Sequence, residues 1–166
     1  MTTAGITVRP AAPGDAEAIC TIYNQGIEDR IATLETQFRT PSERRQWLAS
    51  RGPRHPVIVA EVEGRVVAWG SLNAFNPRDA YKHVADFSVY VERAWRGKGV
   101  GRALLGRLID LAREHGYHKI VLAAFPFNQA GLALYERMGF TQVGIYREQG
   151  LLDGKWVDVL IMEKLL

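Results

Sequence analysis

The segment that decides the fold is F-S-V-Y-V-E-R-A-W-R-G-K-G-V-G-R-A-L-L, Phe87 to Leu105. Its first part, Phe87 to Val91, is rich in β-branched and aromatic residues and predicts a strand. A glycine-rich loop, Arg96 to Gly101, follows. Beyond the loop, apolar residues recur at helical spacing, at Leu104, Leu105, Leu108, Ile109 and Leu111. The segment therefore predicts a strand, a loop and a helix in direct succession.

The loop has a composition suited to phosphate groups. Gly97, Gly99 and Gly101 allow the backbone to adopt positive φ and to approach a ligand closely. The first amides of a helix have no partner within it, and the helix dipole adds positive charge there. Full charges are added by Arg96, Lys98 and Arg102. We therefore expect a phosphate-binding site where the helix begins.

Two common phosphate-binding motifs do not fit the loop. The P-loop pattern needs Gly-Lys-Ser/Thr at an offset where it is absent, and the pattern G-x-G-x-x-G, counted from Gly97, would need glycine where Arg102 stands. The observed R-G-K-G-V-G, Arg96 to Gly101, resembles the acyl-CoA signature Q/R-x-x-G-x-G/A of the GNAT superfamily of N-acetyltransferases. The alternative is a glycine-rich turn before a surface helix.

This resemblance implies acetyl-CoA as the co-substrate and no metal. In GNAT enzymes a bulged strand before the loop, here Ser88 to Val91, offers main-chain bonds to the pantetheine arm and an N–H group to the thioester oxygen. Asn128 resembles the family's CoA-binding asparagine, and it is equally a plain helix N-cap. The implied acetyl-CoA residues are Val89, Tyr90, Val91, Arg96, Gly97, Lys98, Gly99, Val100, Gly101, Arg102 and Asn128.

Composition places the chain among small globular proteins. Its 166 residues, 47% of them hydrophobic, fit a single domain over 1–166 with a substantial core. A net charge of +3 without a basic run does not indicate nucleic-acid binding. The single cysteine, Cys20, excludes an intrachain disulfide, and no Cys/His cluster has metal-ligand spacing. With no signal core at the start and no transmembrane run, we expect a cytoplasmic protein without membrane contact.

Hydrophobic periodicity and turn signals predict eleven elements in the order β-α-α-β-β-β-α-β-α-β-β. Helices are expected to begin at Pro13–Asp15, at Thr40 with Glu43 completing a capping box, and at Asn128; the third of the four helices, which follows the glycine loop, should end at His115-Gly116. The expected strands span 6–9, 57–62, 66–72, 87–91, 119–124, 142–148 and 155–163. This order favours an α/β fold with a mixed, mostly antiparallel sheet and helices on both faces, and it matches the GNAT acyl-CoA N-acyltransferase fold along the chain.

Further segments narrow the resemblance to one branch. R-x-A-Y (Arg78 to Tyr81), A-D-F-S-V-Y-V (Ala85 to Val91) and G-x-W-x-D (Gly154 to Asp158) resemble phosphinothricin N-acetyltransferases. The segment I-Y-N-Q-G-I-E-D-R-I-A-T-L-E-T, Ile22 to Thr36, is similar to the arsinothricin-resistance enzymes of that branch. The resemblance implies antibiotic resistance, a homodimer, and acetyl transfer to the amino group of phosphinothricin, arsinothricin or methionine sulfoximine.

Two residues are expected to carry protons. Asp86 occupies the position of the family's proposed glutamate base and can deprotonate the amine, directly or through water. Its alternative is a solvated or salt-bridged residue at a strand start. Tyr135 lies where many GNAT enzymes place the acid for the thiolate, although the phosphinothricin branch tends to have histidine there. The alternative for Tyr135 is a core tyrosine on a helix face.

Recognition of an acidic amino acid should need cationic and phenolic groups. Arg78 and Tyr81 match the family's substrate residues, whereas the lysine often found two places before that arginine is Asn76 here. Secondary candidates are Arg30, Glu35 and Thr36, although the surface-residue interpretation is favoured for any single one of them. Two other functions stay open, a protein or peptide N-acetyltransferase and a non-catalytic CoA-binding sensor, while a nucleic-acid-binding module is the weakest alternative.

Overall fold

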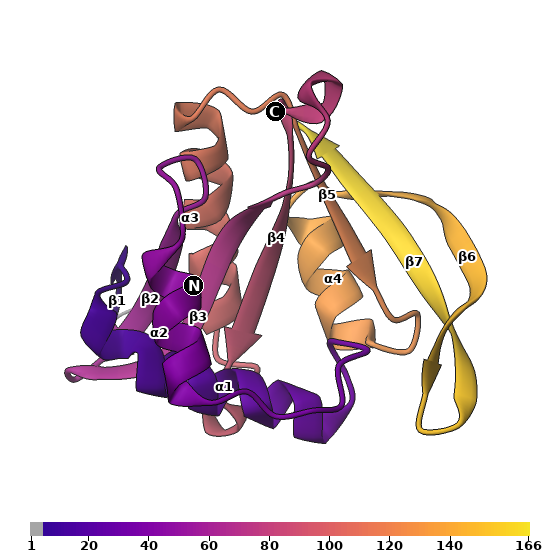
Figure 1. Ribbon diagram of the computed structural model, residues 1–166. Coiled ribbons are helices and arrows are strands. Elements are labelled where there is room, and N and C mark those ends of the chain that lie inside the picture. Colours follow the sequence, from indigo (N-terminus) through magenta and orange to yellow (C-terminus); the bar gives the residue numbers. More distant parts are fainter. Residues whose placement is uncertain (1–4) are drawn as a thin grey trace.

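The protein is described by a computed structural model of residues 5–166; the first four residues, part of the domain expected over 1–166, lie outside the described residues. Seven strands form one sheet in the order β1-β2-β3-β4-β5-β7-β6 (Figure 1). They are β1 (Ile6–Pro10), β2 (Val57–Val62), β3 (Arg65–Ala74), β4 (Val84–Val91), β5 (Lys119–Ala124), β6 (Thr141–Leu152) and β7 (Lys155–Leu165). Only β4 and β5 pair in parallel. The expected mixed, mostly antiparallel sheet is confirmed.

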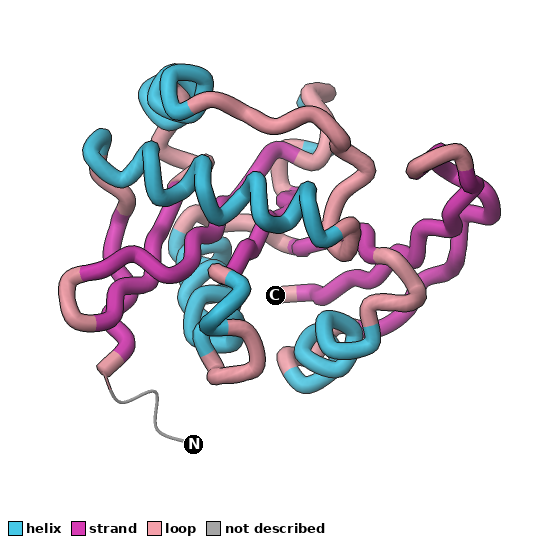
Figure 2. Tube along the Cα trace, turned by 90° about the horizontal axis from the view of Figure 1, so that it is seen from below, coloured by secondary structure: helices cyan, strands magenta, loops and turns pink. Residues whose placement is uncertain are grey.

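Helices cover both faces of this sheet, as Figure 2 shows from below. The helices are α1 (Ala16–Asp29), α2 (Pro41–Ala49), α3 (Val100–Glu114) and α4 (Gln129–Arg137). One hydrophobic cluster joins α1 to the sheet through Ile19 and Trp69, and a larger one joins α3 to it through Leu72 and Leu104. Because side chains alternate along β3, Trp69 faces α1 and α2 while Leu72 faces α3.

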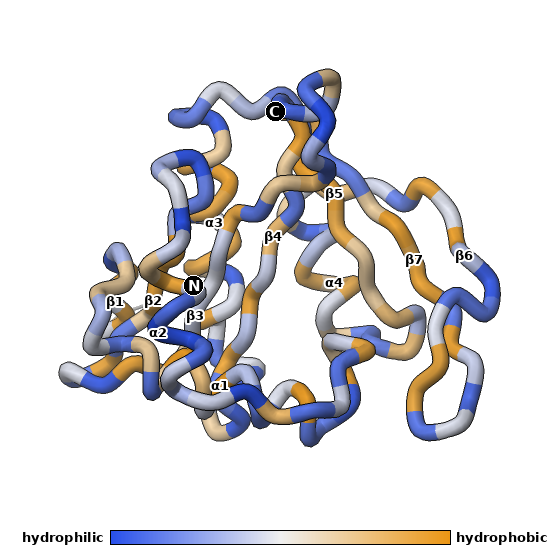
Figure 3. Tube along the Cα trace, viewed as in Figure 1, coloured by the Kyte–Doolittle hydropathy of each residue, from blue (hydrophilic) through white to orange (hydrophobic). Residues whose placement is uncertain are grey.

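Apolar residues are concentrated along the strands and α3, while the connecting turns are mostly hydrophilic (Figure 3). This distribution is that of a packed core covered by polar turns. Among residues 5–166, no helix has both the length and the apolar character needed to cross a membrane.

All eleven predicted elements are present in the predicted order, with some differences at their ends. β4 begins at Val84 rather than Phe87, because its first residues pair with β5. β6 continues beyond Glu148, which has a φ of 49° at a shift in the β6–β7 register. Thr40 caps α2 by accepting from the Glu43 N–H (3.2 Å), but the Glu43 carboxylate accepts from the Thr40 hydroxyl (3.3 Å) rather than from its backbone. The reciprocal half of the predicted capping box is therefore wrong.

Close packing of α1 on β4 depends on Gly26. A Cβ atom at this position would lie 2.9 Å from two ring carbons of Tyr90. That ring cannot shift easily, because Tyr23 and Trp69 lie 5.0 and 5.1 Å from it between ring centroids. Glycine is thus required here by the distance between helix and strand.

The two interior helical glycines should therefore respond oppositely to alanine. Gly26→Ala should lower the free energy of unfolding by about 1 kcal/mol, because overpacking against Tyr90 outweighs the gain in helix propensity. Gly106→Ala is the matched control: its Cβ would meet only Met138 at 3.7 Å, an ordinary contact. It should raise the free energy of unfolding by up to about 1 kcal/mol. Urea denaturation measures both, and equal stabilisation by the two substitutions would contradict the close packing at Gly26.

Candidate active site

A cleft opens where β4 and β5 part. The two parallel strands pair only from Val84–Asp86 to Lys119–Val121. Beyond that point a pocket lies between them, closed on one side by α4 and by the residues that follow α1. Its walls consist of Ile31, Ala32, Phe87, Ser88, Val89, Tyr90, Leu122, Ala123, Ala124, Phe125, Asn128 and Tyr135. The cleft brings the predicted acetyl-CoA strand together with Asn128 and Tyr135.

The open edge of β4 presents main-chain groups to this cleft. The N–H of Glu92 donates to the carbonyl of Val67 (2.8 Å), and β3 and β4 stay in one-to-one register from Ala68–Val91 to Ala74–Ala85. Main-chain groups alternate in direction along an antiparallel pair, so those of Val89 and Val91 face away from β3, toward the cleft. The continuous register also shows that the predicted bulge at Ser88 to Val91 is wrong, because the opening comes from the divergence of β5.

The glycine loop lies at the far end of β4 and starts α3. Gly97 and Gly99 have φ values of 75° and 84°, and Gly99 is the N-cap of the helix. Gly101 lies within α3, so the positive φ expected for it is wrong. A Cβ there would meet Leu134 and Val91 at 3.6 and 3.7 Å, which is ordinary contact. Two glycines, rather than three, therefore need the left-handed backbone.

The three cations expected in the loop are not equivalent. The Arg96 guanidinium binds Asp29 of α1 (2.5 Å) and the carbonyl of Val91 (3.2 Å). Arg93 also binds Asp29 (2.8 Å). Both arginines lower the pKa of the Asp29 carboxyl group, and the hydrogen bond from Arg93 has the larger effect. Lys98 lies over the Trp95 ring, 5.1 Å from its centroid, and Arg102 is exposed. Arg96 thus holds the loop against α1, while Lys98 and Arg102 keep their charge unneutralised by ion pairs within residues 5–166.

Asn128 and Tyr135 face the cleft from α4. The Asn128 carbonyl oxygen accepts from the N–H of Gly131 (3.1 Å), which makes it the N-cap and leaves its amide nitrogen for another partner. The Tyr135 ring packs on Phe87 and Phe140, with centroid separations of 5.8 and 6.2 Å. Burial raises the pKa of Tyr135, so its hydroxyl is protonated at neutral pH.

Asp86 lies at the root of the cleft, in the last β4–β5 pair, opposite Val121. It shares the α1–α2 face of β4 with Tyr90, because side chains alternate along a strand. Burial raises the pKa of Asp86, and a hydrogen bond from Asn73 and the charge of Arg51 lower it. A partly buried carboxyl group with a raised pKa has the properties of a general base.

The surroundings of Asp86 contain polar residues that the sequence did not single out. Asn73 lies directly opposite Asp86 on β3, and Ser71 lies opposite Ser88. The side chains of Ser71, Asn73 and Ser88 are hydrogen-bonded to one another, and Arg51 joins them from the end of α2. The sequence contains one signal for this group: Ser71 and Asn73 are two residues apart in a mostly apolar strand, so both side chains lie on the same face.

Arg78 and Tyr81, which are predicted to bind the acceptor, lie on the segment between β3 and β4. Asn73 lies near the end of β3 and Asp86 near the start of β4, so the two flank this segment. Arg78 is exposed, and its N–H donates to the Asn76 side chain (2.9 Å). Tyr81 is 39% exposed and packs edge-on against Phe75, with 5.7 Å between ring centroids. Asn76, which replaces the family's lysine, thus fixes the backbone before Arg78 and adds no charge.

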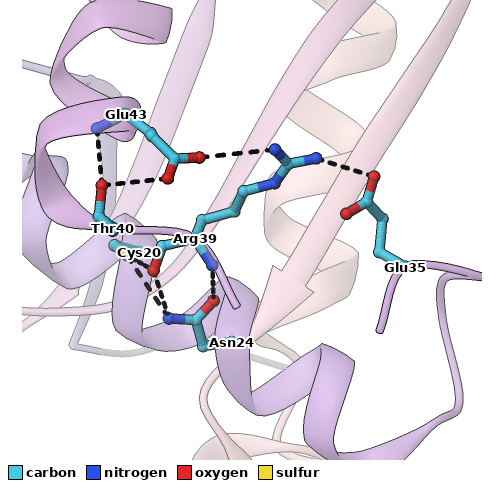
Figure 4. A network of polar contacts seen from close by, with 6 residues as sticks. All are labelled: Cys20, Asn24, Glu35, Arg39, Thr40 and Glu43. Carbon is cyan, nitrogen blue, oxygen red and sulfur yellow. Dashed lines mark hydrogen bonds and ion pairs between the residues drawn. The ribbon is translucent and has the colours of Figure 1, made fainter. Parts of the chain in front are cut away.

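The secondary candidates on the α1–α2 segment have other partners. Glu35 forms an ion pair with Arg39 (2.8 Å), whose N–H and carbonyl are both bound by the side chain of Asn24 (Figure 4). Arg30 pairs with Asp153 in the β6–β7 turn (2.8 Å), and Thr36 is exposed. Neither Glu35 nor Thr36 is part of the cleft wall. The neighbouring Ile31 and Ala32, which sequence reasoning missed, do line it.

The described residues include no group of three or more His, Cys, Asp or Glu side chains arranged to hold a metal ion.

Comparison with known proteins gives a consistent result. A model of the acetyltransferase (GNAT) family matches residues 21–140. The L-methionine sulfoximine/L-methionine sulfone acetyltransferase of Salmonella typhimurium is 33% identical to this chain, and the alignment covers 95% of this chain and 93% of that enzyme.

Two solved structures superpose over nearly the full length. A ribosomal-protein-alanine N-acetyltransferase from Brucella melitensis has a TM-score of 0.93 and 37% identity, with 96% of this chain and 99% of that chain covered. A phosphinothricin acetyltransferase from Sinorhizobium meliloti, solved in complex with acetyl-CoA, has a TM-score of 0.92 and 27% identity, with 98% and 89% covered. The resemblance identified from the motifs is confirmed, and the chain belongs to the acetyltransferase (GNAT) family.

Proposed function

We propose that this acetyltransferase moves the acetyl group of acetyl-CoA to the amino group of a small, acidic amino-acid-like compound of the phosphinothricin, arsinothricin or methionine sulfoximine type. The observation that carries the proposal is the cleft at the parting of β4 and β5. Its wall includes Tyr135 and its root has a carboxyl group, Asp86, while the phosphate-type loop follows the far end of β4. Relatives named for phosphinothricin and methionine sulfoximine support this substrate class.

The residues present fit acetyl-CoA, which supplies an activated acetyl thioester. The backbone around Gly97 and Gly99 leaves the first amides of α3 open for a pyrophosphate, and Lys98 and Arg102 add charge. The free main-chain groups of Val89 and Val91 suit the amide groups of a pantetheine arm. The remaining expected contacts, Tyr90, Val100, Gly101 and Asn128, border the same cleft or the same helix start.

Direct transfer in a ternary complex requires two proton movements on this chain. Asp86 takes a proton from the substrate ammonium group, directly or through one water molecule, so that the amine can attack. Tyr135 gives its hydroxyl proton to the sulfur that leaves, because burial keeps the phenol protonated. A main-chain N–H of β4 stabilises the oxyanion that forms between these steps.

Arg78 and Tyr81 would hold the acidic end of the acceptor. An exposed guanidinium without an ion pair within residues 5–166 can grip a phosphinate, arsinate or carboxylate through two parallel hydrogen bonds. Glu35 and Thr36 remain secondary candidates; Glu35 would first have to leave Arg39. Resistance to such antibiotics follows from the substrate class as part of the same proposal, and the expected cytoplasmic location stays a prediction.

The expected homodimer is part of the proposal and is supported by the β6–β7 hairpin. This hairpin exposes large apolar side chains, namely Val143, Ile145, Tyr146, Leu151 and Trp156, each 44–63% exposed. Several large apolar side chains exposed on one hairpin favour burial against a partner. A second copy of the chain would cover it.

The alternative is acetylation of a protein or peptide, for which the similarity to a ribosomal-protein-alanine N-acetyltransferase is the specific observation. Turnover of acetyl-CoA with a panel of amino acids and peptides distinguishes the two. The absence of any turnover would leave only a CoA-binding sensor.

Substitution of Asp86 tests the chemistry. Asp86→Asn should keep acetyl-CoA binding and lower kcat/KM by roughly 10²-fold, because the amide cannot accept the ammonium proton. In the unsubstituted enzyme the rate should fall toward acidic pH as Asp86 is protonated. Since burial raises the pKa of Asp86, that fall should begin at a higher pH than for an exposed aspartate, and it should be absent from Asp86→Asn. A variant with the original rate at every pH would remove Asp86 from the mechanism.

Substitution of Arg78 tests the acceptor site. Arg78→Ala should raise KM for acidic amino acids about tenfold to a hundredfold, because it removes a hydrogen bond between a charged donor and the substrate. The KM for acetyl-CoA should stay the same, because the glycine loop lies at the opposite end of β4. Arg107→Ala is a suitable control, since this exposed arginine lies on α3, away from both the segment between β3 and β4 and the β6–β7 hairpin. If both variants have unchanged constants for a confirmed acidic substrate, the segment between β3 and β4 does not bind the acidic group.

A further inference from the structure

A strip of polar side chains crosses β3 and β4 on the face that α1 and α2 cover. Ser71 lies opposite Ser88, and Asn73 lies opposite Asp86. The Ser71 side chain is fully buried, and its hydroxyl donates to the Asn73 carbonyl oxygen (3.0 Å). The Asn73 amide nitrogen donates to the Ser88 hydroxyl (3.2 Å). Buried polar groups of this kind persist only when they are hydrogen-bonded, so the strip has a fixed arrangement.

Arg51 completes the strip from the end of α2. Its guanidinium donates to the carbonyls of His55 (3.1 Å) and Leu72 (2.5 Å) and to the Asn73 side-chain oxygen (2.9 Å). It also lies over the Trp47 ring, 4.7 Å from the centroid. No carboxylate of residues 5–166 lies within 4.0 Å of it. Arg51 is thus a cation in a desolvated place without a direct counter-ion, and burial lowers its pKa.

The chemistry of Arg51 decides which way the Asn73 amide points. A guanidinium only donates hydrogen bonds, so the Asn73 group that faces it must be the carbonyl oxygen. The amide nitrogen is then turned to the opposite side, where it donates one hydrogen to Ser88. Its second hydrogen is available to Asp86, which lies directly opposite Asn73 on β4. Without Arg51, the Asn73 amide could rotate and present a carbonyl oxygen to the Asp86 carboxylate.

We propose that Arg51 and Asn73 are positioning residues for Asp86: Arg51 fixes the orientation of the Asn73 amide, and that amide lies directly opposite Asp86 and orients its carboxylate. This inference rests on the proposed role of Asp86 as the base. Arg51 reaches Asp86 through Asn73, whose side-chain oxygen it binds, and its positive charge opposes the rise in the pKa of Asp86 that burial causes. On β5, the charged residue nearest to Asp86 in the pairing register is Lys119, opposite Val84. Its charge is already paired with Glu163 of β7 (2.6 Å). From the segment before β4, His83 is exposed.

The consequence is a defined shift in the pH dependence of the reaction. Burial raises the pKa of Asp86, whereas Asn73 and Arg51 lower it. Removing Arg51 therefore moves the acid limb of kcat/KM to higher pH. The rate lost near neutral pH should be recovered as the pH rises, because the carboxylate is then formed without help. A purely structural defect would instead lower the rate at all pH values.

The decisive experiment is a pH profile of kcat/KM for Arg51→Met, Arg51→Lys and Arg54→Met. In Arg51→Met, kcat/KM should fall about tenfold at neutral pH, which corresponds to the loss of one hydrogen bond from a charged group. It should return to the value of the unsubstituted enzyme at alkaline pH. Arg51→Lys, which keeps a donor and the charge, should lose less. Arg54 is the matched control, because it binds the carbonyl of Lys82 (3.0 Å) and lies over Tyr117 without contacting the strip. Its profile should match that of the unsubstituted enzyme.

A second variant keeps the test independent of the packing of Arg51. Asn73→Asp places a carboxylate opposite Asp86 and should move the acid limb further up in pH, because two neighbouring carboxylates disfavour each other's ionisation. If the acid limb is absent from Asp86→Asn but is unmoved in Arg51→Met and Asn73→Asp, the positioning role is wrong and Asp86 is still the base. If Asp86→Asn keeps the limb, the base assignment itself fails, and the inference fails with it.

Discussion

The rest of the site depends on the loss of backbone pairing between β4 and β5 after Asp86. Two adjacent parallel strands normally share hydrogen bonds along their length, and unpaired N–H and C=O groups are costly when buried. Here the strands diverge after three residue pairs, and the main-chain groups of Val89 and Val91 face a cleft. Such an edge favours a ligand that can supply the missing hydrogen bonds, as the amide groups of a pantetheine arm can.

The alternation of side chains along β4 divides the candidate site residues between the two faces of the sheet. Phe87, Val89 and Val91 point toward α3 and pack in the larger core, while Asp86, Ser88 and Tyr90 point toward α1 and α2. In the proposed mechanism, the acceptor amine and Asp86 occupy one face, and the acetyl-CoA arm approaches through the cleft from the other.

Ion pairs distribute the arginines of this chain between structure and binding. Asp29 engages both Arg93 and Arg96, and so ties the end of α1 to the loop that starts α3. That contact engages the guanidinium of Arg96, a predicted phosphate ligand, and holds the loop that contains Gly97 and Gly99 against α1. Arg51 has the opposite character: no carboxylate neutralises it directly within the described residues, and it binds backbone carbonyls and the side-chain oxygen of Asn73.

The sequence by itself determined the order of the elements, the positive φ at Gly97 and Gly99 and the family. These features depend on side-chain periodicity and turn chemistry within a few residues. Only the tertiary structure decided that β4 opens without a bulge, that Arg96 pairs with Asp29, and that Arg51 orients Asn73. The partners in those last two contacts are 67 and 22 residues apart along the chain, and no local pattern connects them. Their meeting follows from how α1, α2 and the sheet pack, because packing brings together donors and acceptors that the chain keeps apart.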